Sequence, residues 1–150
     1  MKYWTRRSIL PDITQLHPNL RESDVLELEA MSVKPRTALT HGYLNGECHT
    51  GMCEDTVICM YGVVPDEHGA RIWMLSREGI EKHALPVSRI TRGEVKRFSQ
   101  KHTVLYNVVD ERNKIIIRWL KWLGFKFGAR YLIGTNKHSF KEFHLWSEQA

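Results

Sequence analysis

The stretch that decides the fold is residues 113–125, which read Asn-Lys-Ile-Ile-Ile-Arg-Trp-Leu-Lys-Trp-Leu-Gly-Phe. Apolar side chains recur along it at the spacing of one helix face, while Lys and Arg side chains occupy another face. Two acidic residues precede the stretch and Gly124 follows its apolar part, which suits the helix dipole and the usual end of a helix. The sequence therefore predicts an amphipathic helix over residues 113–123, with Trp119 and Trp122 in or beside the core.

The segments on either side of this helix predict a sheet. Residues 103–109, Thr-Val-Leu-Tyr-Asn-Val-Val, are β-rich and mostly apolar, which is typical of a central strand. Two further strands are predicted at 126–133 and 140–146, on either side of a turn that begins with Gly-Thr-Asn. Before the central strand, residues 85–102 carry apolar side chains at helical spacing and basic ones between them.

The first half of the chain supplies the remaining elements. Helical spacing and an opening proline predict two helical segments, and period-two patterns between turn residues predict an antiparallel meander. The expected order is β-α-α-β-β-β-α-β-α-β-β, without an internal repeat or linker. The expected segments are a strand at 3–9, a first helical segment from 10 to 31 that Pro18 interrupts, a helix at 35–46 and strands at 47–53, 56–64 and 70–75.

Length and composition set the class of protein. The chain has 150 residues, of which 42% are hydrophobic and 26% charged, so we expect one folded domain over residues 1–150 and exclude disorder and coiled coil. The net charge is +5, and residues 91–130 alone hold ten Lys or Arg against three acids. An excess of positive charge in one region indicates an anionic partner.

The three cysteines, Cys48, Cys53 and Cys59, are expected to be reduced. Their odd number excludes a complete set of internal disulfides, and their spacing lacks the second compact pair of a zinc site, so we expect no bound metal. The chain shows neither a signal-peptide core nor an apolar stretch long enough to span a membrane. We therefore expect a protein of the cytoplasm.

Three features allow more than one interpretation. The basic region could bind nucleic acid or be a solvated face; without a recognisable binding motif, we do not expect a nucleic-acid partner. His83 and His102 bracket a predicted helix and could act as bases, although such histidines more often cap helices. The connection between the strand ending at Leu75 and the next helix could hold a phosphate or be an ordinary loop, and both readings stay open.

The decisive stretch also resembles a known family. The spacing Asn113-x-x-Ile116-x-x-Trp119-Leu-x-x-x-Gly124-Phe125 is similar to the Asn-x-x-Ala-x-x-Leu-Tyr-x-x-x-Gly-Phe pattern of the GNAT superfamily of N-acetyltransferases. Together with the order of elements, the resemblance implies an α+β fold with a GNAT-like mixed, mostly antiparallel sheet flanked by helices.

A finer resemblance is to the T7-type phage internal virion protein family that carries a GNAT-like domain. It rests on residues 59–65 (Cys-Met-Tyr-Gly-Val-Val-Pro), 72–76 (Ile-Trp-Met-Leu-Ser) and 117–124 (Ile-Arg-Trp-Leu-Lys-Trp-Leu-Gly). It implies a protein of the host cytoplasm or the virion, whose partner is a protein acceptor or a virion or host protein.

The resemblance implies an acetyl-CoA site between the strand ending at Leu75 and the strand ending at Val109. The chain departs from the family at Leu120, where a tyrosine usually supplies the acid, and at Glu81, which falls in the pyrophosphate loop. Tyr106 or a water molecule would have to replace the missing acid. The alternative is a non-catalytic virion or host-interaction protein on the same scaffold. The residues expected to bind the cofactor are Met74, Leu75, Ser76, Gly79, Ile80 and Asn113.

Overall fold

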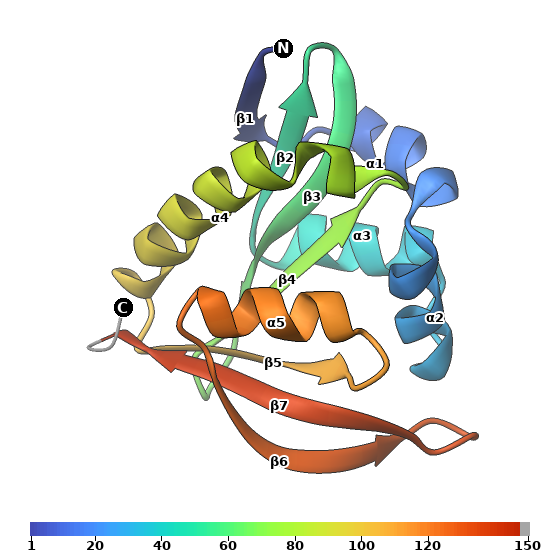
Figure 1. The fold of residues 1–150 in the computed structure, drawn as a ribbon, viewed down its shortest axis with the longest axis vertical. Helices are drawn as coiled ribbons and strands as arrows, with labels where there is room; N and C mark the ends of the chain where they lie inside the picture. Colours follow the sequence, from blue (N-terminus) through green and yellow to red (C-terminus); the bar gives the residue numbers. More distant parts are fainter. Residues whose placement is uncertain (148–150) are drawn as a thin grey trace.

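The computed structural model describes residues 1–147 as one seven-stranded sheet with helices on both faces (Figure 1). The strands lie in the order β1-β2-β3-β4-β5-β7-β6. Only β4 and β5 are parallel neighbours, and the other pairs are antiparallel, which confirms the mixed, mostly antiparallel α+β sheet. The strands are β1 (Tyr3–Arg7), β2 (Glu47–Cys53), β3 (Thr56–Pro65), β4 (Ala70–Ser76), β5 (Val104–Asp110), β6 (Lys126–Ile133) and β7 (His138–Trp146).

The helices follow the predicted segments with one correction near the N-terminus. The two helical segments expected between the first two strands are three α-helices and a short 3₁₀ turn, His17–Asn19, around Pro18. Proline lacks the N–H that would continue the first helix, so the chain turns there and begins again at Glu22. The helices are α1 (Leu10–Leu16), α2 (Glu22–Ala30), α3 (Pro35–Asn45), α4 (Ala84–Ser99) and α5 (Lys114–Trp122).

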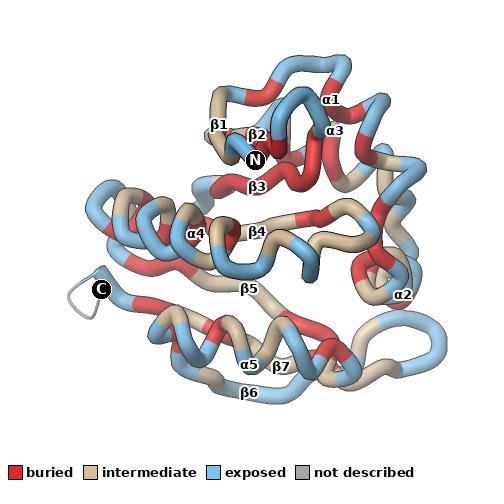
Figure 2. The backbone as a smooth tube through the Cα atoms, turned by 45° about the horizontal axis from the view of Figure 1, so that its top comes forward, coloured by how far each residue is buried: buried red, intermediate tan, exposed pale blue. Residues whose placement is uncertain are grey.

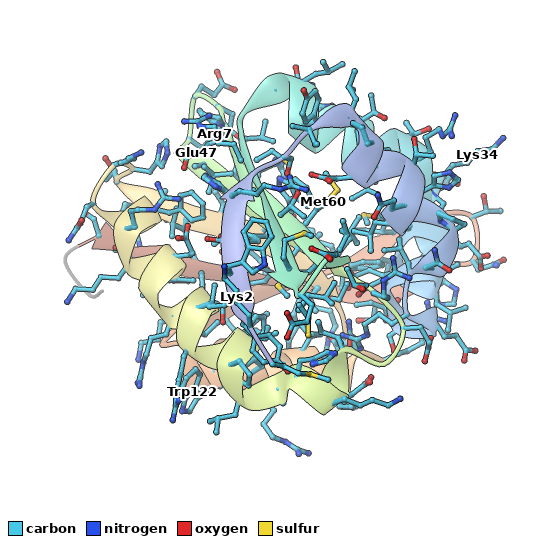
Figure 3. All side chains as sticks on the ribbon, turned by 90° about the horizontal axis from the view of Figure 1, so that it is seen from above. Lys2, Arg7, Lys34, Glu47, Met60 and Trp122 are labelled. Atoms are coloured by element: carbon cyan, nitrogen blue, oxygen red, sulfur yellow. The ribbon has the colours of Figure 1, made fainter. Side chains whose placement is uncertain are left out.

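Two apolar layers hold the helices against the sheet. On one face α4 and α5 cover the core around Phe98 and Leu105, and on the other face α1, α2 and α3 cover the core around Leu16, Leu39 and Met60. In Figure 2, β3 is buried along most of its length, whereas α4 and α5 alternate between buried and exposed residues. Figure 3 places Met60 in the middle of the molecule, which agrees with its complete burial. Burial on both faces of β3 makes it the central strand of the core.

The apolar face of α5 is narrower than its sequence predicts. Leu120 is buried and Ile116 is partly buried, but Ile115 is 60% exposed and Trp122 is 47% exposed. Trp122 lies at the edge of the molecule in Figure 3, where the guanidinium of Arg92 on α4 stacks over its ring at 4.4 Å. Trp122 is thus part of a surface contact between α4 and α5.

The sheet is interrupted between β4 and β5. These strands pair only at Ala70 with Leu105 and at Arg71 with Tyr106, after which the ladder ends. On its other edge β4 pairs with β3 along its whole length, from Ala70 to Ser76. The divergence of β4 from β5 opens the sheet at its centre.

Candidate functional site

A cavity of about 490 Å³ lies where β4 and β5 separate. Its walls come from both faces of the sheet, because α2 and α3 line one side and α4 and α5 line the other. Most of the lining is apolar, and a small number of polar groups project into it. A concave, mainly apolar cavity with a few convergent polar groups is the usual form of a small-molecule site.

The edge of β4 that faces the cavity has one backbone position that the protein itself does not use. The carbonyl of Ile72 accepts a hydrogen bond from Nδ2 of Asn107 (2.8 Å), so Ile72 turns its backbone toward β5. Ser76 does the same, since its N–H donates to Asp24 Oδ2 and its carbonyl accepts from the N–H of Arg21. The alternation of a strand then turns the N–H and C=O of Met74, between them, toward the cavity.

Side chains from α2 connect the diverging ends of β4 and β5. Asp24 binds the N–H of Ser76 on β4 (2.9 Å), and Glu27 Oε1 accepts from the N–H of Asp110 on β5 (2.7 Å). Arg21, just before α2, lies 4.0 Å from Asp24 and donates to the side chain of Asn113 (3.2 Å). We call Arg21, Asp24 and Glu27 the α2 bridge; it holds the two strand ends apart while satisfying their backbone groups.

Burial raises the pKa of both carboxyl groups in the α2 bridge. It raises the pKa of Asp24 to about 6, against the opposing effects of the Ser76 N–H and the Arg21 charge. It raises the pKa of Glu27 to about 7, with the charges of Asp24 and Asp110 adding to burial and the Asp110 N–H opposing it. Both groups line the cavity, so the site contains carboxyl groups that exchange protons near neutral pH.

A buried donor in the cavity wall has no hydrogen-bond partner among residues 1–147. The indole Nε1 of Trp73 is inaccessible to solvent and unpaired within this part of the chain. The ring of Trp73 packs against α3 at Gly42, where a Cβ atom would lie only 2.3 Å from the indole. Since buried polar groups in folded proteins are nearly always paired, this donor marks a position where a ligand could bind.

The predicted cofactor-binding residues fall into two places. Met74, Leu75, Ser76 and Asn113 line the cavity. Gly79 and Ile80 lie outside it, on the connection from β4 to α4; these predicted contacts and roles stay untested.

Some backbone N–H groups of the connection from β4 to α4 already donate hydrogen bonds to other backbone groups of the protein. Gly79 has a left-handed backbone (φ 86°) with open space where a side chain would be. The N–H of Ile80 donates to the Arg77 carbonyl (3.1 Å), and the N–H of Glu78 donates to the Asn19 carbonyl (2.8 Å). The carboxylate of Glu81 is exposed, and α4 follows from Ala84 with the positive end of its dipole toward this connection.

Tyr106 does not line the cavity, although the resemblance led us to expect it there. Its hydroxyl donates to the side chain of Asp66, and its ring stacks with Arg71 at 4.9 Å, beside the paired part of β4 and β5. Burial, together with the Asp66 carboxylate, raises the pKa of Tyr106. Leu120, where the family pattern has its tyrosine, is buried and does line the cavity.

The other sequence candidates lie apart from the cavity. The three cysteines are free and buried, and burial raises the pKa of Cys59 to about 12. Within residues 1–147, no group of three or more His, Cys, Asp or Glu side chains is arranged to hold a metal ion. His83 shares a hydrogen bond with the hydroxyl of Tyr3 (2.7 Å) and is absent from the cavity wall. No helix in this part of the chain is long and apolar enough to cross a membrane.

Solved structures of the same fold identify the architecture. The ribosomal-protein-S18-alanine N-acetyltransferase from Escherichia coli superposes with a TM-score of 0.74 at 9% identity, covering 99% of this chain and 96% of that one. A GNAT-family acetyltransferase from Bacillus anthracis gives a TM-score of 0.73 at 12% identity, with coverage of 99% and 96%. The Bacillus subtilis acetyltransferase in complex with CoA gives 0.66 at 10% identity, with 97% of both chains covered.

These likenesses establish the class of fold, which is that of the GNAT N-acetyltransferases. No protein-family model and no curated protein matches the chain by sequence. Nothing in the comparisons indicates the phage internal virion protein family, so that finer resemblance rests on the three quoted sequence stretches alone.

The α2 bridge is the part of the site that sequence reasoning missed. The sequence predicts a helical segment around Asp24 and Glu27 but assigns neither residue a role. A signal was nevertheless present, because Asp24, Glu27, Leu28 and Met31 follow the i, i+3, i+4, i+7 spacing of a single helix face. Carboxylates on the same face as core leucine and methionine side chains are directed toward the protein interior.

Proposed function

We propose that this protein binds acetyl-CoA in the cavity between β4 and β5 and transfers the acetyl group to an amine. The observation that carries the proposal is the end of the β4–β5 ladder after Arg71, which turns the backbone of Met74 toward a cavity of about 490 Å³. An unpaired strand edge can form hydrogen bonds with the amides of an extended ligand arm, as another strand would. The fold of the neighbours, one of which holds CoA, supports the same conclusion.

The residues present fit such a ligand in two respects. Met74 offers a backbone donor and acceptor to the thioester and its arm, and the apolar walls formed by Ile116 and Leu120 exclude water from the reacting carbonyl. The exposed bases of α4 and α5, such as Arg92 and Lys121, give the outer side of this region positive charge that favours phosphate groups. When bound, acetyl-CoA supplies a thioester carbonyl whose C–S bond breaks as the amine nitrogen bonds to carbon.

A second candidate is a protein that binds acetyl-CoA without transferring the acetyl group. The observation in its favour is Leu120, an apolar side chain in the cavity wall where the family pattern has a proton donor. A virion or host protein as the partner belongs to this candidate, whereas the phage setting applies to both candidates; both rest on the sequence resemblance. Binding and transfer measured separately distinguish the two candidates.

The test is a thermal-shift titration with acetyl-CoA. Ligand at 100 times its dissociation constant stabilises a protein by about 2.7 kcal/mol, which for this chain length is a shift of roughly 5–10 °C. Ile116→Trp fills the cavity and should abolish the shift, whereas Ile115→Trp, on the exposed side of the same helix, should retain it. An unchanged melting temperature at millimolar acetyl-CoA would refute the proposal; a shift without acetylated product from an amine panel would favour the second candidate.

A further inference from the structure

An acyl-transfer site for amines must remove a proton before the carbon–nitrogen bond forms. A primary amine is an ammonium ion at neutral pH and has no free electron pair until it loses a proton. The group that takes this proton must lie in the cavity and must have an oxygen or nitrogen that no other group of the protein occupies. The ionisable side chains in the cavity wall, apart from the Tyr61 hydroxyl, are Arg21, Asp24, Glu27, His41, Arg71 and Glu94.

Most of these groups are committed to partners or unsuited to the role. The two arginines cannot act as bases. Glu94 and Asp24 are each in an ion pair with an arginine, Glu94 with Arg97 at 2.5 Å and Asp24 with Arg21 at 4.0 Å, and Asp24 also accepts the N–H of Ser76. His41 is exposed on α3 and shares its Nδ1 with Asn45 of the same helix (3.2 Å). Glu27 is the remaining carboxylate.

Glu27 is held by one oxygen only. Its Oε1 accepts the N–H of Asp110, which fixes the carboxylate at the end of β5. Within the described chain, residues 1–147, its Oε2 makes no hydrogen bond or ion pair that would compete with a ligand. A carboxylate that lines a cavity and is anchored through one oxygen has the geometry of a positioned base.

The charges around Glu27 favour a cation beside it. The facing groups are Arg21 and Asp24 on the α2 side and Asp110 and Arg112 on the β5 side. When Glu27 is ionised, three carboxylates face two guanidinium groups, so one negative charge stays uncompensated in a partly buried place. A bound ammonium would neutralise that charge, because an unpaired buried charge is unfavourable.

The cavity wall next to Glu27 limits which chemical group can carry the bound ammonium. On the α2–α3 side most of the lining is apolar, formed by Leu28, Met31, Val33 and Ala38 with the indole of Trp73 beneath them, and Thr37 and His41 of α3 add polar groups. The Nε1 of Trp73 is a buried donor on this side, and residues 1–147 offer it no hydrogen-bond partner. Such a wall fits an apolar group better than the several charges of a polyamine, each of which needs a partner.

We propose that Glu27 is the base that takes the proton from the acceptor amine, and that the acceptor is a primary amine on an apolar group, bound against α2 and α3. The inference rests on the proposed acetyl transfer. The ammonium loses one proton to Glu27 before the nitrogen bonds to the acetyl carbon, and it loses a second as the C–S bond breaks. The departing sulfur takes up one proton, and Glu27 returns the other to solvent.

The experiment uses phenethylamine as the probe and 2-phenylethanol as its neutral counterpart. Without acetyl-CoA, we expect phenethylamine to bind the wild-type protein at pH 8 and to bind Glu27→Gln at least tenfold more weakly. The affinity of 2-phenylethanol should be the same for both proteins. Chemical-shift titration by NMR measures this binding. Equal affinity of phenethylamine for wild type and Glu27→Gln, or no binding to wild type, would overturn the acceptor site.

Turnover supplies the second measurement. Glu27→Gln should lower kcat/KM for phenethylamine by about 10²–10⁴-fold and remove the acidic limb of the pH profile, while the acetyl-CoA thermal shift stays within 1 °C of wild type. Glu22→Gln changes an exposed carboxylate of the same helix that is not part of the cavity wall; it is the matched control and should keep the rate and the pH limb. Glu27→Asp, which retains a carboxylate, should recover part of the activity and the limb.

The outcomes separate the two proposals. A wild-type protein that acetyl-CoA does not stabilise overturns the proposed function, whatever Glu27 does. A wild type that acetyl-CoA stabilises, but whose pH limb and rate survive Glu27→Gln, overturns only the role of Glu27. Stabilisation by acetyl-CoA together with failure to acetylate phenethylamine overturns the apolar acceptor class.

Discussion

The two edges of β4 differ more than any other pair of neighbouring regions in this protein. Toward β3, the strand is paired along all seven of its residues; toward β5, it is paired at two and then open. Unpaired backbone groups inside a protein are unfavourable, so an open edge persists only where other groups occupy it. Here Asn107 and the α2 bridge occupy the edge on either side of Met74. One edge provides stability and the other provides a binding surface.

The largest expected effect comes from β3, the strand that pairs with the closed edge of β4. Gly62 on β3 faces Trp73 in the ladder, and a Cβ atom there would lie 2.0 Å from the carbonyl oxygen of Glu47. Gly62→Ala should lower the free energy of unfolding by about 3 kcal/mol, because the β2 backbone at Glu47 and Cys48 must move away from β3. Gly93→Ala, in an exposed turn of α4 with open space, is the control and should raise it by up to about 1 kcal/mol. Urea denaturation measures both; similar values would contradict the close packing of β3 against β2 that keeps β3 in place beside β4.

At the open edge of β4 we expect a smaller effect, which is a dependence of the unfolding free energy on pH. Burial raises the folded-state pKa of Glu27 to about 7, above its unfolded value of about 4.3. Its contribution to stability is therefore complete below pH 4 and is lost as the pH rises through 7. Glu27→Gln removes this loss. The pKa difference corresponds to at most about 3.7 kcal/mol, and solvent screening of this partly buried carboxylate reduces it, so the unfolding free energy of the variant relative to wild type should rise by about 2 kcal/mol between pH 4 and pH 8.

Denaturation at the two pH values checks this result. Glu22→Gln changes an exposed residue of the same helix and is the matched control. If the difference in unfolding free energy between Glu27→Gln and wild type is the same at pH 4 and pH 8, burial does not raise the pKa of Glu27.

The smallest effect concerns the point where the ladder ends. Asn107→Ala removes the side-chain hydrogen bond to the Ile72 carbonyl and should lower stability by about 1 kcal/mol. It should also speed amide hydrogen exchange in β4 more than in β3, because Ile72, the first β4 residue beyond the ladder, loses its hydrogen-bond partner. Asn45→Ala, which breaks bonds only within the exposed end of α3, should leave exchange in β4 unchanged. Equal exchange rates in wild type and Asn107→Ala would show that Asn107 does not hold this point.

The sequence predicts well what depends on local pattern. The strands at 47–53 and 126–133 have the predicted bounds, and helix α5 lies within its predicted stretch, because turn residues and periodicity determine such elements. It predicts poorly what depends on distant contacts. Glu27 meets Asp110, 83 positions away, and no local pattern reports that pair. Tyr106 is next to Asn107 in sequence, yet the alternation of β5 directs its side chain to Asp66, away from the cavity.

The burial of the cysteines has a practical consequence for the study of this protein. Acetyl transfer releases a free CoA thiol, which a disulfide reagent such as dithionitrobenzoate reports by colour. Cys48, Cys53 and Cys59 are all buried, and burial raises the pKa of Cys48 as well as that of Cys59, so the folded protein should react with the reagent slowly. The native protein is therefore suited to a continuous assay in which every rapidly reacting thiol comes from product.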